Sequence, residues 1–276
     1  MYKKNGIILY EDISLYDGSP VVAIMTGTRY PSRNPKTGMM LQVWILRADM
    51  HPVEALKNGG DASICGDCKH RPNSEGKRSC YVNPMTFSSV WRAYKAGKYA
   101  KLSTGLVPEF GNVSLHSIVK GRDVRIGAYG DPAVIPAHLW RYWFRSARLV
   151  TGYTHFWKTI SAEYAEFCMA SVDTASERAE AVSLGYRTFR CLDKDESLSY
   201  DEITCPASIE SGHSTSCDKC GLCSGSMDDR DNKIPSIAIT VHGVGAKYFR
   251  KSVDSTETEQ GKDSVAVREK ESEEDS

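Results

Sequence analysis

Two groups of cysteines are the residues of this sequence most able to do chemistry. The first group contains three thiols with the spacing C-x2-C-x11-C, namely Cys65, Cys68 and Cys80. Three thiolates can hold a metal and leave one coordination position open, as a catalytic metal site requires. A fourth ligand from His70 would instead close the site and make it structural zinc. The spacing alone leaves both alternatives open.

The second group contains four thiols, which is enough to close a tetrahedral or cubane site. A cysteine followed by proline precedes a C-x2-C-x2-C run, and the four members are Cys205, Cys217, Cys220 and Cys223. Such a run is the spacing of ferredoxin-type sequences, whereas zinc sites more often use two separated C-x2-C pairs. We therefore predict iron–sulfur clusters, with a structural zinc knuckle as the alternative. His213 is a possible substitute ligand.

The expected compartment supports metal chemistry over disulfide formation. No apolar run approaches the roughly 20 residues that span a bilayer, and the N-terminus has no apolar segment long enough for a signal peptide. We therefore expect a cytoplasmic protein with no membrane partner, in which nine cysteines indicate metal or redox chemistry. The two cysteines outside the groups, Cys168 and Cys191, fall in predicted strands and are interpreted as buried small hydrophobic residues.

The elements that must position these thiols alternate between strands and helices. Predicted strands cover 123–129, 149–153, 167–172, 186–191 and 237–241, and predicted helices cover 85–100, 136–146 and 175–184. This alternation favours βαβ units and a mainly parallel sheet, with the chemistry at the carboxyl ends of the strands. A chain of 276 residues with 41% hydrophobic content is within the range of one α/β domain.

A β-hairpin is predicted near the N-terminus, with strands at 21–27 and 40–46. Its long loop carries three basic residues, Arg29, Arg33 and Lys36. The loop could meet an anionic substrate, although a solvated hairpin tip is the simpler interpretation.

The charge of the chain is zero overall but unevenly distributed. Residues 251–276 carry four basic and nine acidic residues, so the other 250 carry 31 basic and 26 acidic residues. The acidic end has almost no apolar content, which predicts a disordered tail. A mildly basic body is compatible with a nucleic-acid partner and equally with an ordinary solvated surface. We therefore expect a single α/β catalytic domain at 1–250 and an acidic tail at 251–276.

A glycine-rich motif follows one predicted strand. Gly127 and Gly130 would let the backbone approach a ligand closely, and Asp131 could accept a hydrogen bond from an ammonium group or a ribose hydroxyl. The alternative for Asp131 is a turn with an Asx-type bond. His155 follows the next strand on the same rim, where a single histidine is more often structural than catalytic. Asp173 is a further candidate on this rim.

These features resemble the cysteine-rich, radical-SAM-like proteins encoded by tailed bacteriophages. The resemblance covers roughly residues 60 to 245. It rests on Cys65, Cys68 and Cys80-Tyr81, on the segment Gly127 to Pro132, and on Cys205, Cys217, Cys220 and Cys223. It implies a partial or complete (β/α) barrel of the radical-SAM type. Three cysteines of such enzymes hold a [4Fe–4S] cluster whose open iron binds S-adenosylmethionine, with the usual spacing C-x3-C-x2-C.

The resemblance also implies roles for particular residues. Cys65, Cys68 and Cys80 would be the ligands of this cluster, and the four later cysteines would hold an auxiliary cluster. Gly130 and Asp131 are the nearest match to the acidic motif that contacts the amino group of the cofactor. Gly127 precedes them as a further cofactor-binding candidate, and Asp131 and His155 are the candidate catalytic residues.

The implied activity is that of a radical S-adenosylmethionine isomerase in bacteriophage DNA modification. Some phages are thought to use such enzymes to rearrange amino-acid-modified thymines, which protects their DNA from host nucleases. DNA or a modified nucleotide would then be the partner, in the host cytoplasm. Two alternatives remain open. One is a zinc-stabilised nucleic-acid-binding protein without catalysis, and the other is a zinc-dependent hydrolase that uses the first three thiols.

Overall fold

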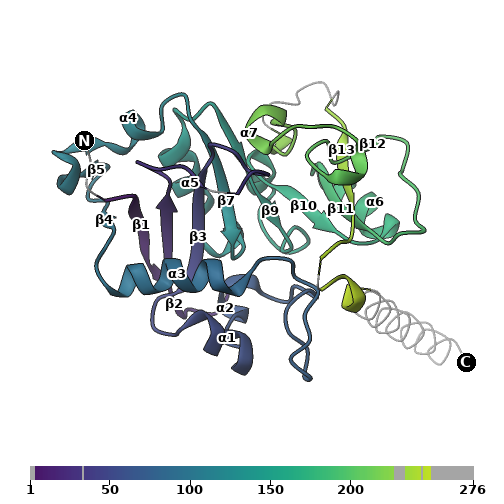
Figure 1. Cartoon of the computed structure of the whole chain (residues 1–276), viewed down its shortest axis with the longest axis horizontal. Coiled ribbons are helices and arrows are strands. Elements are labelled where there is room, and N and C mark those ends of the chain that lie inside the picture. Colours follow the sequence, from purple (N-terminus) through teal and green to yellow (C-terminus); the bar gives the residue numbers. More distant parts are fainter. Residues whose placement is uncertain (1–3, 33, 227–233, 244, 250–276) are drawn as a thin grey trace, which may run out of the picture.

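The computed structural model describes residues 4–32, 34–226, 234–243 and 245–249 (Figure 1). Arg33 of the hairpin loop and the predicted acidic tail lie outside these residues. The longer strands are β1 (Gly6–Ile13), β2 (Pro20–Thr26), β3 (Leu41–Arg47), β7 (Asp123–Tyr129), β10 (Met169–Val172), β11 (Thr188–Leu192) and β13 (Ser236–Thr240). The shorter strands are β4 (Ala100–Lys101), β5 (Leu106–Val107), β6 (Val113–Ser114), β8 (Leu149–Thr151), β9 (Tyr153–Thr154) and β12 (Glu202–Thr204).

The helices are short and lie between the strands. The α-helices are α1 (Pro52–Asn58), α2 (Ala62–Cys65), α3 (Pro84–Lys95), α4 (Leu115–Val119), α5 (Ala137–Phe144), α6 (Ala175–Ser183) and α7 (Cys217–Cys220). Single 3-10 turns are η1 (Pro108–Phe110), η2 (Pro132–Val134), η3 (Ala162–Glu166), η4 (Ile209–Ser211) and η6 (Ala246–Tyr248). Within the described ranges, none of the helices has the length and apolar character of a membrane span.

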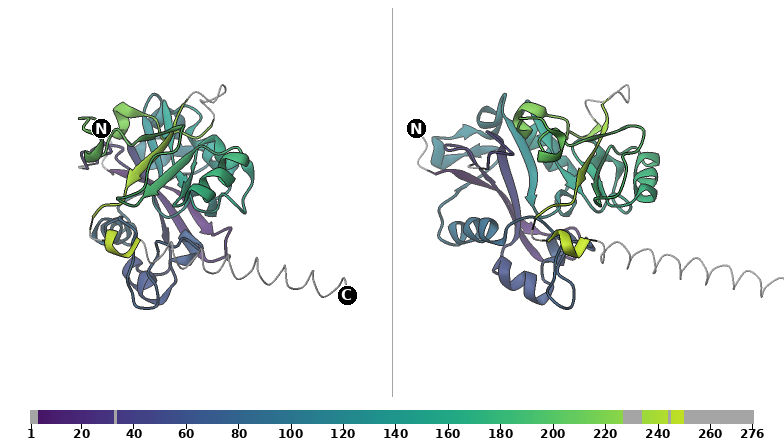
Figure 2. Two further views of the ribbon diagram at one scale, coloured as in Figure 1. Left: turned by 90° about the vertical axis from the view of Figure 1, so that its right-hand side faces the viewer. Right: turned by 45° about the vertical axis from the view of Figure 1, so that its right-hand side comes forward.

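Two sheets form the framework of the molecule. The first has six strands in the order β4-β1-β2-β3-β7-β8, with antiparallel pairing along β1-β2-β3 and parallel pairing along β3-β7-β8. The second has five strands in the order β12-β13-β11-β10-β9, all parallel. Figure 2 shows the two sheets lying beside each other, the first in purple to teal and the second in green to yellow.

Gly152 is the point at which the chain passes from the first sheet to the second. The strand β8 pairs with β7 and ends at Thr151, while β9 begins at Tyr153 and pairs with β10. A Cβ on Gly152 would lie 2.6 Å from Cγ1 of Ile126 and 3.0 Å from Sγ of Cys168, so a side chain does not fit there. The single strand predicted at 149–153 is therefore wrong, because it consists of two strands in different sheets.

The α/β class and most of the predicted elements are confirmed. The hairpin of β2 and β3, the strand β7 and the helices α3, α5 and α6 lie where the sequence predicts them, with ends that differ by a few residues. The parallel part runs from β3 through both sheets to β12, as the βαβ alternation predicts. Neither sheet closes into a barrel within the described residues. A barrel of the radical-SAM type therefore stays a prediction.

The main core lies on the six-stranded sheet and is covered by helices that include α3 and α5. In Figure 1 the helix α3 crosses one face of this sheet, and Phe87 of this helix is fully buried. Trp140 and Trp143 of α5 are 1% and 4% exposed and belong to this core. This apolar packing supplies most of the free energy that holds the strand ends and the cysteine loops in place.

Candidate metal centres

The first thiol site, which consists of Cys65, Cys68 and Cys80, lies at the carboxyl end of β7. The backbone N–H of Asp131 donates to the carbonyl of Ile64 at 2.7 Å, which ties the end of β7 to the helix that carries Cys65. The N–H of Cys68 donates to the carbonyl of Cys65 at 3.2 Å. All three thiols are half-buried, and Cys65 is within electrostatic reach of the other two. The structure thus brings the three thiols together at the predicted edge of the sheet.

The tight turn between Cys65 and Cys68 is held by a buried ion pair. Arg71 donates two hydrogen bonds to the Asp61 carboxylate, at 2.9 Å and 2.8 Å, and a third to the carbonyl of Gly66 at 2.8 Å. Asp61 is 1% exposed. A bidentate arginine–carboxylate pair is geometrically specific, so it fixes the start of the loop independently of any metal.

Gly66 is the position of this loop where a side chain is excluded. Its φ is +54°, and a Cβ would lie 2.1 Å from the ring of Phe156. We expect Gly66→Ala to displace the turn and to lower metal binding at the first thiol site at least tenfold, measured as metal retained per chain after desalting. Gly76→Ala is the matched control, because Gly76 has φ +71° in the same loop and no atom within 4 Å of its Cβ position. Equal metal retention in the two variants would contradict this account.

Cys68 and His155 interact electrostatically at this site. The side chain of His155 lies within electrostatic reach of the Cys68 thiol, and its backbone N–H donates to Oδ2 of Asp131 at 2.7 Å. Burial alone would lower the pKa of His155, but Cys68 and Asp131 raise it well above its ordinary value. Burial alone would raise the pKa of Cys68, but His155 lowers it. Cys68 is therefore favoured as a thiolate, the form that binds metal.

The other two thiols of the site behave differently. Burial raises the pKa of Cys65 well above its usual value, and burial also raises that of Cys80. Arg78 acts in the opposite direction on Cys80, and it donates to the carbonyl of Cys80 at 3.1 Å. The Nη1 atom of Arg78 is buried and has no hydrogen-bond partner among the described residues. Positive charge is thus present beside the thiols, and a metal would take the place of their protons.

Asp131 is held by the protein itself. It is 4% exposed, its Oδ1 accepts from the N–H of Ala133 at 3.0 Å, and its Oδ2 accepts from the N–H of His155. The bond to Ala133 is the Asx-type turn that was the alternative for this residue. Asp131 therefore joins the ends of β7 and β9 and positions His155.

The two glycines before Asp131 are required for close packing. A Cβ on Gly130 would lie 2.7 Å from Cβ of Ile45, and a Cβ on Gly127 would lie 2.8 Å from the carbonyl oxygen of Gly130. Their φ angles are +80° and +65°. The structure therefore explains both glycines by contacts within the protein.

His70 and Asp173 form a second polar group beside the first thiol site. Nδ1 of His70 lies 2.7 Å from Oγ of Ser79, and Nε2 lies 3.0 Å from Oδ2 of Asp173. Lys69 lies 3.1 Å from the same carboxylate oxygen. Burial would raise the pKa of Asp173, but His70 and Lys69 lower it to about 2. Because both ring nitrogens of His70 are occupied, it is not available as a fourth metal ligand without breaking these bonds.

The structure places a fourth thiol near the first site. Cys191 lies within electrostatic reach of Cys68 and Cys80, and burial together with Asp173 raises its pKa well above the ordinary value. Val172 pairs with Arg190 in the parallel sheet, so Asp173 and Cys191 follow at the same edge. Parallel pairing of two predicted strands was therefore a signal that could have found Cys191. Its interpretation as a buried apolar residue is incomplete, whereas Cys168 is fully buried in the main core as expected.

A pocket of about 460 Å³ adjoins the turn of the first thiol site. Its walls include Tyr16, His138, Phe156 and Glu163. Phe156 also packs on Gly66, and the Tyr16 hydroxyl donates to Oδ1 of Asp67 at 2.9 Å. The rings of Tyr16 and Phe156 meet edge to face, with centroids 5.4 Å apart. This volume is typical of small-molecule sites, so the pocket is the candidate position of a substrate.

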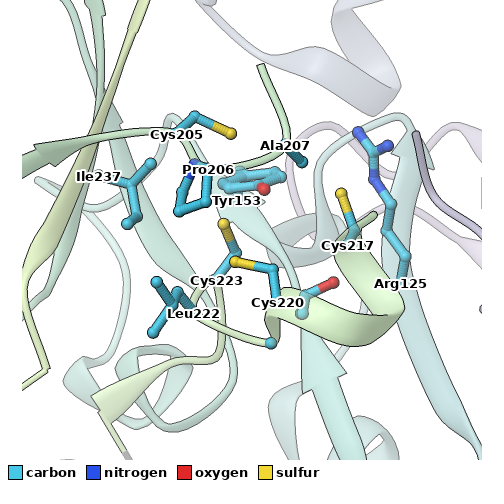
Figure 3. A pocket seen from close by; sticks show the side chains of 12 residues that line it. Arg125, Tyr153, Cys205, Pro206, Ala207, Cys217, Cys220, Leu222, Cys223 and Ile237 are labelled. Carbon is cyan, nitrogen blue, oxygen red and sulfur yellow. The ribbon is translucent and has the colours of Figure 1, made fainter. Parts of the chain in front are cut away.

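The second thiol site consists of Cys205, Cys217, Cys220 and Cys223, whose side chains surround one pocket (Figure 3). Cys205 follows β12, and its N–H donates to the carbonyl of Ala238 on β13 at 2.7 Å. Cys217 and Cys220 begin and end α7. Gly221 caps this helix with φ +68°, which turns the chain back so that Cys223 faces the same pocket. The four thiols predicted as one group are thus brought together.

The hairpin loop between β2 and β3 packs against this second site. The N–H of Cys217 donates to the carbonyl of Lys36 at 2.7 Å, and the N–H of Met39 donates to Oδ2 of Asp218 at 2.9 Å. The interpretation of this loop as a solvated tip holds for Tyr30, Pro31, Asn34 and Pro35, which are exposed, but not for the end of the loop, which is hydrogen-bonded to α7. The sequence separation of about 180 residues hid this contact from local pattern analysis.

Burial dominates the electrostatics of the second site. Burial raises the pKa of Cys205 and of Cys217. It also raises the pKa of Cys223 to about 12, although Tyr153 acts in the opposite direction and lowers it. His213 is exposed and does not line the pocket. Within the described ranges, no three His, Cys, Asp or Glu side chains form a ready-made ligand set for one metal ion. The thiols converge, but their final ligand geometry would have to form on binding.

Comparisons with known proteins give no match. No family model matches the chain, and no curated protein and no solved structure matches it.

Proposed function

We propose that this chain is an iron–sulfur enzyme with two unlike centres, an open one at the first thiol site and a closed one at the second. The observation that carries the proposal is the difference between the two sets of donors. The first set has three thiols from one loop, and both ring nitrogens of the neighbouring His70 are already occupied. The second set has four thiols around one pocket. A three-thiolate cluster keeps one iron free for a substrate or cofactor.

The residues beside the first thiol site suit such a group. His155 favours the thiolate form of Cys68, and Arg78 supplies positive charge beside Cys80. Asp131 holds the backbone of His155 in place. An open cluster iron would supply one electron to a bound cofactor. Tyr16 and Phe156 line the 460 Å³ pocket, and the ring of Phe156 connects this pocket to the loop at Gly66.

The particular activity that we propose is a radical-SAM-type isomerisation of an amino-acid-modified thymine in phage DNA. The support for it is the resemblance described above, together with the three-thiol set and the mildly basic body. The fit of S-adenosylmethionine to Asp131 is poor, because this carboxylate is 4% exposed, does not line the 460 Å³ pocket and accepts bonds from two backbone amides. We therefore assign no cofactor contact to Asp131, and we assign to it the positioning of His155.

The activity is tested with the anaerobically reconstituted and reduced protein. We expect added S-adenosylmethionine to be cleaved to 5′-deoxyadenosine, and we expect Cys65→Ala to abolish the cleavage. Cys168→Ala is the control, because this thiol is fully buried in the main core and belongs to neither group of candidate ligands. Absence of cleavage by the iron-loaded protein would exclude the radical-SAM reaction. A nucleoside digest of phage DNA that is unchanged by deletion of the gene would exclude the proposed substrate.

A separate variant tests whether the first site is open. Cys191 packs against the apolar cluster of Met169 and Ile237 and belongs to β11, outside the loop of the three ligands. We therefore expect Cys191→Ala to leave the iron content of the first site unchanged. Loss of about four irons from this variant would identify Cys191 as a fourth ligand and would close the site.

The second candidate function is a zinc-stabilised nucleic-acid-binding protein. One observation favours it, which is that the pocket lined by the four thiols of the second site has a free volume of only about 20 Å³. A single ion would require a smaller rearrangement of the four thiols than a four-iron cube would. This candidate predicts bound zinc, a colourless protein and DNA binding that weakens steeply with salt.

A further inference from the structure

Arg125 is the one charged side chain that lines the pocket of the second thiol site, among the residues that the structure describes. It is the third residue of β7 and lies beside Cys217 (Figure 3). Its Nη2 donates to the hydroxyl of Tyr81 at 2.8 Å. Its guanidinium carbon lies 5.8 Å from the centroid of the Tyr153 ring. The guanidinium is thus held on two sides by aromatic residues.

The Nε atom of Arg125 is buried without a hydrogen-bond partner in the described part of the chain. Buried donors of this kind are rare, because an unsatisfied donor loses its hydration and gains nothing in return. A guanidinium also keeps its positive charge at every pH at which proteins fold. The Nε atom of Arg125 is thus available to donate to a sulfur of the same pocket, which is lined by four thiols and by no carboxylate.

Four thiolates around a metal centre supply such an acceptor. A cluster or metal ion held by four cysteines carries net negative charge, and its sulfurs accept hydrogen bonds. The reduction potential of an iron–sulfur cluster depends on its net charge and on hydrogen bonds to its sulfurs. A cation fixed beside the cluster stabilises the reduced form more than the oxidised form, because the reduced form carries one more negative charge.

We propose that Arg125 is a positioning residue of the second centre, which balances the charge of the four-thiolate cluster and raises its reduction potential. This inference rests on the proposed function, because it requires a cluster at the second site. Tyr81 fixes the guanidinium, and it directly follows Cys80 of the first thiol site. The hydrogen bond between Arg125 and Tyr81 therefore connects the loop of the first centre to the guanidinium beside the second centre.

The test is a redox titration of the reconstituted full-length chain, followed by electron paramagnetic resonance. We expect Arg125→Met to lower the midpoint potential of the second centre and to leave the midpoint potential of the first centre unchanged. Arg125→Lys keeps the charge and should show a much smaller shift. Tyr81→Phe should lower the midpoint potential by less than Arg125→Met does, because the guanidinium remains but loses the hydroxyl that holds it in place. Iron content and thermal stability are recorded for each variant.

Arg122→Met is the matched control. Arg122 lies just before the same strand, and it donates to the carbonyls of Gly27 and Thr28, away from the thiols. Its loss should leave both potentials unchanged. Should Arg125→Met not retain the cluster, the lysine and Tyr81→Phe variants decide the question. If all iron-loaded variants have the wild-type midpoint potentials, the inference about Arg125 is overturned. If the wild-type chain binds no iron, the proposed function itself is overturned.

Discussion

Replacing Cys217 and Cys220 together by serine is expected to remove one of two bound clusters. The loss should amount to about four irons per chain, with about four retained at the first thiol site. The thiols of the two sites lie on separate segments of the chain, with Cys65 at the end of α2 and Cys217 and Cys220 on α7. Two of the four ligands of the closed site are lost in this variant, so its cluster has no stable coordination left. The remaining cluster should keep its own spectroscopic signal.

The control for this experiment is again Cys168→Ala, which removes a thiol that no site uses. It should retain all of the iron. Complete loss of iron from the double serine variant would contradict two independent centres and indicate that a single centre draws on both loops. Retention of all iron would show that the later cysteines hold no cluster.

Glu202→Gln is expected to lower the free energy of unfolding by about 3–5 kcal/mol, the cost of breaking a buried ion pair on one side. Glu202 and Arg190 have side chains that are 0% and 2% exposed, and Nη2 of Arg190 lies 2.7 Å from Oε2 of Glu202. The same carboxylate accepts from the N–H of Ser199 at 2.8 Å. The pair orders the segment that leads through β12 to Cys205, so the variant should also lower metal retention at the second thiol site.

Urea unfolding measures this effect, and Glu166→Gln is its control. Glu166 pairs with Arg141 at 2.8 Å, but the two side chains are 35% and 45% exposed, so the loss should be about 0–1 kcal/mol. Equal losses in the two variants would contradict the structural role of the buried pair.

The buried pair also predicts a pH dependence. Burial alone would raise the pKa of Glu202, but the bonds from Arg190 and Ser199 lower it below the ordinary value of 4.5. A carboxyl group with a lowered pKa stabilises the fold above the unfolded pKa, and the stabilisation is lost as the pH falls through the folded pKa. The Gln variant should therefore lose less stability than the wild type on acidification below about pH 4.5.

Residue patterns within short stretches of sequence predicted most of the longer elements of this fold, although not β1 or α1, because such elements are defined by local interactions. The strand β7 has alternating and buried apolar residues within seven positions, and α6 begins with a capping box at Thr174 and Glu177. Both signals lie entirely within a short window of sequence. The two cysteine groups were predicted for the same reason, since ligand spacing within a loop is local.

Contacts between distant segments were not predictable in this way. Three such contacts depend on the order of strands in the sheets. They are the hydrogen bond between Lys36 and Cys217, the proximity of Cys191 to Cys68, and the position of Arg125 beside the second site. That order is set by packing over the whole chain. The role of Asp131 was ambiguous for a related reason, because its partner His155 becomes a neighbour only when β7 and β9 end at the same edge.

The most direct test of two metal centres is the composition of the protein purified without oxygen. Its visible spectrum would be recorded together with iron, acid-labile sulfide and zinc per chain. We predict a brown protein with broad absorption near roughly 400 nm and about eight irons and eight sulfides, as two cubane clusters contain. A colourless protein with one or two zinc ions and no iron would contradict this account and favour the zinc-stabilised binding protein.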